Sequence, residues 1–343
     1  MTRAGYSIRT LAICSLLFVL VATAHAQRRQ PVASDDEQWD LIEEGRTLHD
    51  NQEFDSAIAR YNQVLALNPH SIDAIFELTA SYYDKGDYRQ SLEAARRGTD
   101  YDSEHLSYFY LMLGTNHDLL KQPQKAVEAY KAGLAIEPSN YLLEYNLAVT
   151  YLNLKRPDEA RECFKRAIAL NPNHTSSHIG LGQLYVQQGD RMPALLALSR
   201  AAILEPETGR SEVAIALIGG LLIPAEGRTT EKGREGGFAV LEPVLASGEG
   251  FEGAWTGDPA QVASRLKHVL ERLRNADAAG LGTGFAAQYY APYFRALATR
   301  GFAEPFAYYI QQSRGGELIT GWLIGNEQRV NQFLQWSKEY TWE

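Results

Sequence analysis

Cysteine is scarce in this chain of 343 residues, which contains only Cys14 and Cys163. Cys14 lies in an N-terminal apolar segment that we expect to be removed, so a single cysteine remains in the mature chain. An intramolecular disulfide is therefore excluded, although exported proteins commonly contain one. Cys163 stands next to Phe164 in a predicted helix. We interpret it as a small core residue rather than a reactive thiol.

Long apolar runs and clusters of positive charge are also missing. Beyond the N-terminus no stretch approaches the roughly 18 apolar residues that suggest a membrane-spanning helix. The formal net charge is −9, and no basic stripe interrupts the acidic composition. Nucleic acids and anionic membranes both attract clustered Lys and Arg, so such a chain binds them poorly. We expect no integral membrane segment in the mature chain and no nucleic-acid partner.

Motifs that carry catalysis or hold a cofactor are absent as well. The sequence has no G-x-S-x-G elbow, P-loop, H-E-x-x-H or C-x-x-C pattern. His174 and His178 are four residues apart, but His174 follows Pro172 in a predicted loop and no third metal ligand is near. We interpret them as a loop histidine and a surface histidine. The sequence predicts a protein that is not an enzyme, with no catalytic residue, no metal site and no cofactor.

The first 26 residues have the pattern of a signal peptide. Arg3 and Arg9 are followed by an apolar run over 11–21, which ends in the small-x-small sequence Ala-His-Ala. We expect cleavage after Ala26 and a periplasmic or secreted protein whose net charge changes from −9 to −11 on loss of the two arginines. The alternative is an uncleaved N-terminal anchor. Residues 27–37 are polar and predict a short flexible leader.

A repeat then becomes visible in the spacing of prolines that close helical patterns. These prolines are Pro69, Pro138, Pro172 and Pro206, at intervals of 69, 34 and 34 residues. The first interval is two repeats long, and the unit within it ends at Ser103 without its proline. Self-similarity at such a period is typical of helical repeat proteins.

The residues within these units resemble the tetratricopeptide repeat family. The fourth unit matches the family signature at Leu147, Ala148, Tyr151, Ala160, Phe164, Ala167 and Pro172. The fifth unit matches at Leu181, Gly182, Tyr185, Ala194, Leu198, Ala201 and Pro206. The resemblance covers 38–208 and gives five units, at 38–71, 72–106, 107–140, 141–174 and 175–208. It implies an all-α, right-handed solenoid of helix-turn-helix units, in which Gly182 and Ala194 meet where two helices cross.

The pattern fades after Pro206. Residues 209–223 predict an apolar capping helix, and the glycines of 224–257 predict a linker region. A smaller helical C-terminal domain follows at 258–343. Aromatic residues gather at 285–310, and we interpret them as helical core with a few surface tyrosines, the alternative being a platform that stacks on sugar rings.

The resemblance also implies where a ligand binds. Family members use outward positions on the first helix of each unit, and here these would line a concave, aromatic and apolar groove: Arg46, Phe76, Tyr83, Tyr108, Leu111, Tyr145 and Leu152. Members that clamp a terminal carboxylate carry several Lys, Arg and Asn there, whereas this groove has one cation. We expect a protein or peptide ligand that presents large apolar side chains.

Two alternatives stay open at this stage. In the first, the chain's own C-terminal helices fill the groove and the partner binds elsewhere. In the second, the chain is an enzyme or a glycan-binding protein whose site lies in the aromatic-rich residues 238–343.

Overall fold

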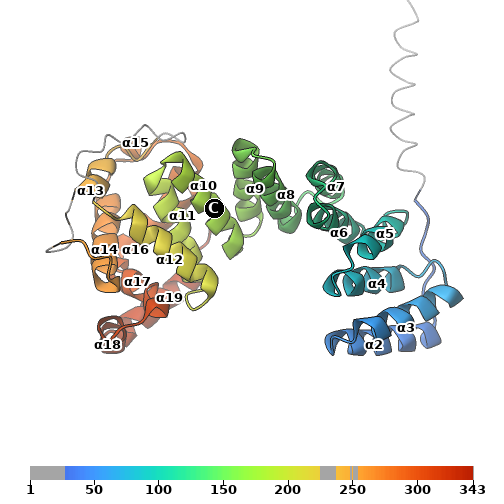
Figure 1. Ribbon diagram of the computed structural model, residues 1–343. Helices are drawn as coiled ribbons and strands as arrows, with labels where there is room; N and C mark the ends of the chain where they lie inside the picture. The colour runs from blue at the N-terminus through green and yellow to red at the C-terminus, as the bar shows by residue number, and fades with distance from the viewer. Residues whose placement is uncertain (1–27, 225–236, 248, 250–253, 343) are drawn as a thin grey trace, which may run out of the picture. The chain divides into compact units, whose positions relative to one another are not determined.

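The computed structural model describes residues 28–224, 237–247, 249 and 254–342 (Figure 1). The chain is an all-α repeat solenoid followed by a helical C-terminal domain. It divides into two compact units, Met1–Leu154 and Lys155–Glu343, with the boundary between the two helices of the fourth repeat. The predicted signal peptide lies outside the described residues. None of the helices in the described part is both long and apolar enough to cross a membrane.

The first unit consists of antiparallel helix pairs. Each second helix packs on the first helix of its own repeat and on that of the next repeat, which buries a continuous core. Its helices are α2 (Asp36–Asp50), α3 (Phe54–Leu67), α4 (Ile72–Asp84), α5 (Tyr88–Gly98), α6 (Leu106–Leu119), α7 (Pro123–Ile136) and α8 (Tyr141–Asn153).

Capping residues fix where these helices begin. The side chains of Asp35, Ser71 and Asp87 each accept a hydrogen bond from a backbone N–H three residues later, which satisfies a donor that has no partner within the helix. Asp87 follows Gly86, whose φ of 87° turns the chain between α4 and α5. Gly86 and Asp87 thus form the turn that joins the two helices of the second repeat.

Glycines allow the two helices of a repeat to approach closely. A Cβ atom added to Gly45 or Gly114 would come within 2.4 or 2.2 Å of the ring of Tyr61 or Tyr130. At Gly182 the nearest atom is Leu198 Cγ, at 2.7 Å. An added side chain at Gly182 would therefore meet Leu198 first, and the expected contact with Ala194 stays a prediction.

The polar residues before α2 form a hydrogen-bonded segment, not the flexible leader that their composition suggests. Arg29 N donates to Asp100 O at 2.8 Å and Arg29 O accepts from Asp102 N at 2.9 Å, in a parallel bridge. Val32 N donates to His70 O at 3.1 Å. The leader contacts the loops that follow the first and second repeats, and its own backbone groups make the contacts.

The second unit begins with the second helix of the fourth repeat. α11 is buried on all sides from Met192 to Ile203, as its nearly unbroken apolar sequence requires, and it packs against α10, α12 and η1. The helices of this unit are α9 (Pro157–Leu170), α10 (Thr175–Gln188), α11 (Arg191–Leu204), α12 (Gly209–Leu221), α13 (Glu242–Ala246), α14 (Pro259–Asn275), α15 (Ala278–Leu281), the π-helix η1 (Ala286–Tyr290), α16 (Ala291–Thr299), α17 (Ala303–Tyr309), the 3-10 helix η2 (Gln312–Arg314), α18 (Glu317–Gly325) and α19 (Glu327–Glu339).

The expected linker contains packed structure. Phe238, Leu241 and Leu245 are buried, and Arg265 of α14 lies wholly inside the unit beneath them. The Arg265 guanidinium donates to the carbonyl oxygens of Leu222, Glu249, Val244, Leu245 and Ser247, at 2.6, 2.5, 3.3, 3.0 and 2.5 Å. Part of the linker, at 238–245, therefore contributes buried side chains to the core, and the prediction from its glycine content is wrong there.

His178 of α10 is fully buried, so the surface position expected for it is wrong. Its Nδ1 lies 2.7 Å from the hydroxyl oxygen of Tyr290 in η1, and its Nε2 lies 3.0 Å from the carbonyl oxygen of Pro172. A carbonyl only accepts, so Nε2 carries the proton and Nδ1 accepts from the tyrosine O–H. Burial, helped by the positive charge of Arg200, lowers the pKa of His178 to about 3.

Four of the nine aromatic residues of 285–310 lie in the core of the C-terminal domain. They are Tyr290, Tyr293, Phe294 and Phe306, and the ring of Phe294 meets those of Tyr293 and Phe306 edge to face. Cys163 is likewise buried, which confirms its assignment to the core.

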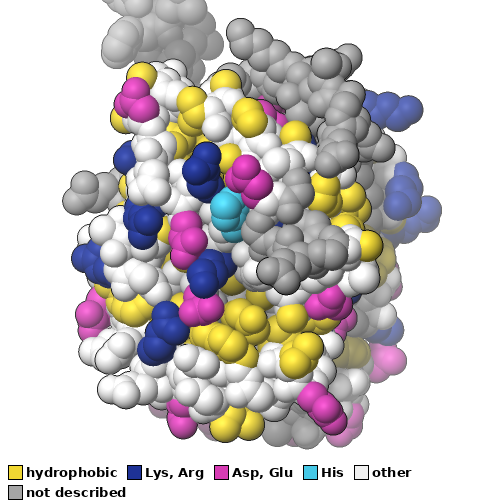
Figure 2. All heavy atoms as spheres, turned by 90° about the vertical axis from the view of Figure 1, so that its left-hand side faces the viewer, with side chains coloured by type: hydrophobic (Ala, Val, Ile, Leu, Met, Phe, Trp, Pro, Cys, Tyr) yellow, Lys and Arg dark blue, Asp and Glu magenta, His cyan; other side chains and the backbone are white. Residues whose placement is uncertain are grey.

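The surface of the second unit mixes charges of both signs. Figure 2 shows Lys and Arg side chains interspersed with Asp and Glu on one face, beside a band of hydrophobic side chains. In this unit Glu304 of α17 pairs with Lys267 and Arg329 at 3.1 Å each. On α18, Leu318 and Ile324 are 74% and 73% exposed.

Candidate ligand-binding face

The first helices of successive repeats lie next to one another in the first unit. α2 contacts α4, α4 contacts α6, and α6 contacts α8. The outward residues of these four helices form what we call the first-helix face. Every predicted site residue on it is partly buried: Arg46, Phe76, Tyr83, Tyr108, Leu111, Tyr145 and Leu152.

An aromatic pair occupies the middle of this face. The rings of Phe76 on α4 and Tyr108 on α6 have centroids 4.3 Å apart, and His105 lies 4.5 Å from Phe76. Both members of the pair pack on the core below, and burial raises the pKa of the Tyr108 hydroxyl. Tyr83 contacts Tyr88 instead, at 5.8 Å. The structure therefore joins two of the four predicted aromatics and places Tyr83 beside a different ring.

Arg46, the one cation among the predicted site residues, forms ion pairs with two carboxylates. Arg46 donates to Glu77 Oε1 at 2.7 Å and to Glu43 Oε1 at 2.5 Å, and its guanidinium lies 5.7 Å from the ring centre of Trp39. Burial lowers the pKa of Arg46, but the two carboxylates outweigh it and leave the pKa above its usual value. This paired cation does not suit the capture of a terminal carboxylate.

Sequence reasoning missed the acidic character of the face. His49 lies 3.2 Å from the carboxylate of Asp84 on the next first helix. Asp118 of α6 accepts from Thr150 at 2.5 Å and from Tyr130 at 3.3 Å, and burial raises the pKa of this carboxyl despite both bonds. Acidic residues that recur at outward positions of α4 and α6 were the available signal.

The second unit shows where the C-terminal domain packs on the fifth repeat. Tyr290 reaches the buried face of α10, and Tyr293 and Trp342 reach Arg200 on α11. The outward residues Gln183 and Gln187 of α10 stay exposed. On this repeat, the C-terminal helices cover the second helix and leave those outward positions of the first helix open.

Residues 107–140 and 141–174 each match the sequence profile of the tetratricopeptide repeat. The chain contains tetratricopeptide repeats. The two matches have the same bounds as the predicted third and fourth units.

Several known proteins are similar to this chain over part of its length. The small glutamine-rich tetratricopeptide repeat-containing protein 2 of Mycosarcoma maydis is 29% identical over 112 residues, 32% of this chain and 31% of that protein. The Hsp70-Hsp90 organizing protein of Triticum aestivum is 27% identical over 110 residues, 32% of this chain and 18% of that protein. The chain thus spans less than a third of either relative. The crystal structure of MamA aligns with a TM-score of 0.44 at 22% identity, over 51% of this chain and 96% of that one.

Proposed function

We propose that this protein is an exported scaffold that binds a protein or peptide partner through the first-helix face. The observation that carries the proposal is the Phe76–Tyr108 pair, which two neighbouring repeats present together on a partly exposed surface. Aromatic side chains are the commonest anchors of protein interfaces. The tetratricopeptide repeats support a binding role over catalysis.

The charged and aromatic residues of the first-helix face indicate which kind of partner would fit it. Glu77 and Asp84 lie on α4 beside the aromatic pair, and Asp118 lies on α6. A segment that places a large apolar side chain on the pair and a Lys or Arg near these carboxylates would complement the face in shape and charge. A helix or an extended strand can present such a combination.

Truncation of Tyr108 tests this role. With a partner captured by crosslinking from the native source, Tyr108→Ala and Leu111→Ala in the full mature chain should each weaken binding about tenfold, or about 1.4 kcal/mol. Leu67→Ala is the matched control, because Leu67 is exposed on the second helix α3. Tyr108 also packs on Phe76, so its variant should melt at a lower temperature, and binding is therefore compared at temperatures where all variants are folded.

The result that contradicts the proposal is equally definite. If Tyr108→Ala and Leu111→Ala bind the partner as tightly as Leu67→Ala once folded, the first-helix face is not the binding surface.

Export belongs to the same proposal and rests on the N-terminal sequence pattern. We expect the intact mass of the protein recovered outside the cytoplasm to lack residues 1–26. A mature species that retains them would leave the anchor as the correct interpretation.

A further inference from the structure

A positive charge is buried in the second unit without a negative partner. Arg200 of α11 is 4% exposed, and its Nη2 donates to Asn173 Oδ1 at 2.9 Å. Its guanidinium lies 4.6 Å from the ring centre of Trp342 and 5.7 Å from that of Tyr293. Within the described part of the chain no carboxylate pairs with it, and its buried Nε has no hydrogen-bond partner. Burial of an uncompensated charge is unfavourable.

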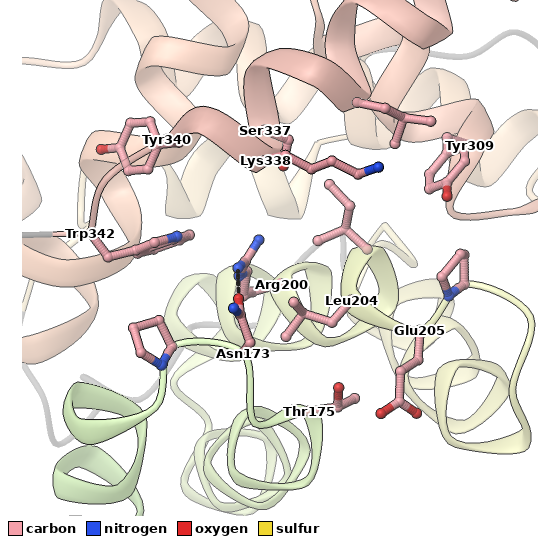
Figure 3. Close-up of a pocket in the computed structure, with 14 residues that line it drawn as sticks. Asn173, Thr175, Arg200, Leu204, Glu205, Tyr309, Ser337, Lys338, Tyr340 and Trp342 are labelled. Atoms are coloured by element: carbon pink, nitrogen blue, oxygen red, sulfur yellow. Dashed lines mark hydrogen bonds between the residues drawn. The ribbon is translucent and has the colours of Figure 1, made fainter.

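This charge forms the floor of a half-open pocket of about 660 Å³. Figure 3 shows Arg200 rising from α11 toward Ser337 and Lys338 of α19, with Trp342 on one side and Leu204 on the other. The remaining wall combines apolar and polar residues. Its apolar and aromatic part includes Ile203, Leu334, Pro172, Pro206 and Tyr309, and its polar part consists of Asn173, Thr175 and Glu205, whose carboxylate pairs with Arg210. A volume of this size is typical of small-molecule sites.

We propose that the pocket binds a small molecule that carries a carboxylate on an apolar body. A guanidinium is a planar fork of donors that matches a carboxylate with two parallel hydrogen bonds. The rings of Trp342 and Tyr293 lie near Arg200, which favours the cation. Lys338 supplies a second positive charge at the opening, and Ile203, Leu204 and Leu334 accept the apolar part.

Two sources present this chemistry, a free organic acid and the terminal carboxylate of a peptide. The probes are hexanoate and N-acetylleucine, each compared with its uncharged amide, and inorganic phosphate. On the full mature chain, at least one acid should bind and raise the melting temperature, and its amide should bind at least about tenfold more weakly. Tighter binding of hexanoate indicates a free acid, and tighter binding of N-acetylleucine indicates a peptide end.

Substitutions then test whether the acid binds in this pocket. Arg200→Met should abolish the preference for acid over amide. Its unliganded melting temperature should stay the same or rise, because a desolvated charge is removed. Lys338→Met, at an exposed position, should weaken acid binding severalfold. Arg272→Met is the control, because Arg272 is exposed on α14, does not line the pocket and should leave binding unchanged.

Three results would overturn the proposal. They are equal binding of acid and amide, stronger binding of phosphate than of either acid, and no binding of either acid below about 10 mM. Should Arg200→Met fail to fold, the acid–amide comparison on the unmodified chain and the Lys338→Met variant decide the question. The pocket shares no residue with the first-helix face, so either proposal can fail alone.

Discussion

Replacing Arg265 with Met should lower the free energy of unfolding of the second unit by at least about 3 kcal/mol. The side chain donates to five backbone carbonyls, and several of these end α12 and α13, where a helix has no internal donor left for them. Met fills a similar volume but donates nothing, so buried acceptors would lose their partner. Each such loss costs about 1–3 kcal/mol, before any relaxation of the segment.

Urea denaturation of the full chain measures this effect. Arg272→Met is the matched control, because Arg272 lies on the same helix and is exposed, and surface substitutions usually change stability by less than about 0.5 kcal/mol. Arg265→Lys keeps the charge but cannot reach several carbonyls at once, so we expect an intermediate loss. Equal unfolding midpoints for Arg265→Met and Arg272→Met would show that these hydrogen bonds do not support the unit.

Acid should destabilise the protein through His178. Its pKa in the folded chain is lowered to about 3, against an ordinary value near 6.5, so the unfolded chain binds a proton that the folded chain excludes. Above about pH 6.5 the imidazole is neutral in the unfolded chain as well, so burying it in the folded chain costs no stability. The free energy of unfolding falls by up to about 1.4 kcal/mol for each pH unit below that value, until the pH nears 3.

The comparison of His178→Gln with the unmodified chain isolates this histidine. Gln retains a donor and an acceptor for Pro172 and Tyr290 but takes up no proton, so the loss of stability between pH 6.5 and 4 should become shallower. His268→Gln, at a partly exposed position on α14, controls for the loss of a histidine. Identical slopes for both variants would mean that His178 becomes protonated without unfolding the chain.

The repeats could be predicted because their determinants are close together in sequence. Gly114 and Tyr130 lie in one repeat, and their spacing recurs along the chain. His178 could not be placed in the same way, because its partner Tyr290 is 112 residues away and belongs to no repeat. The contacts of Arg265 were equally invisible, since its acceptors are backbone carbonyls and any residue type supplies those.

Some features of the candidate site could likewise be predicted from the sequence, and others could not. Resemblance to a family identified the outward positions, and the structure joins Phe76 to Tyr108 among them. The ion pair of Arg46 with Glu77 could not be foreseen from one helix, because Glu77 comes from the next repeat and only the packing of α2 on α4 brings them together.

The hydrogen bonds of the leader have a consequence for how the N-terminal end of the chain opens. In a linear stack, the outermost repeat contacts one neighbour and can peel away by itself. Here residues 29–32 are hydrogen-bonded to the loops after the first and the second repeats. Separating the first repeat from the stack therefore also strains the hydrogen bonds between the leader and the loop after the second repeat. We expect the two repeats to unfold as one cooperative segment.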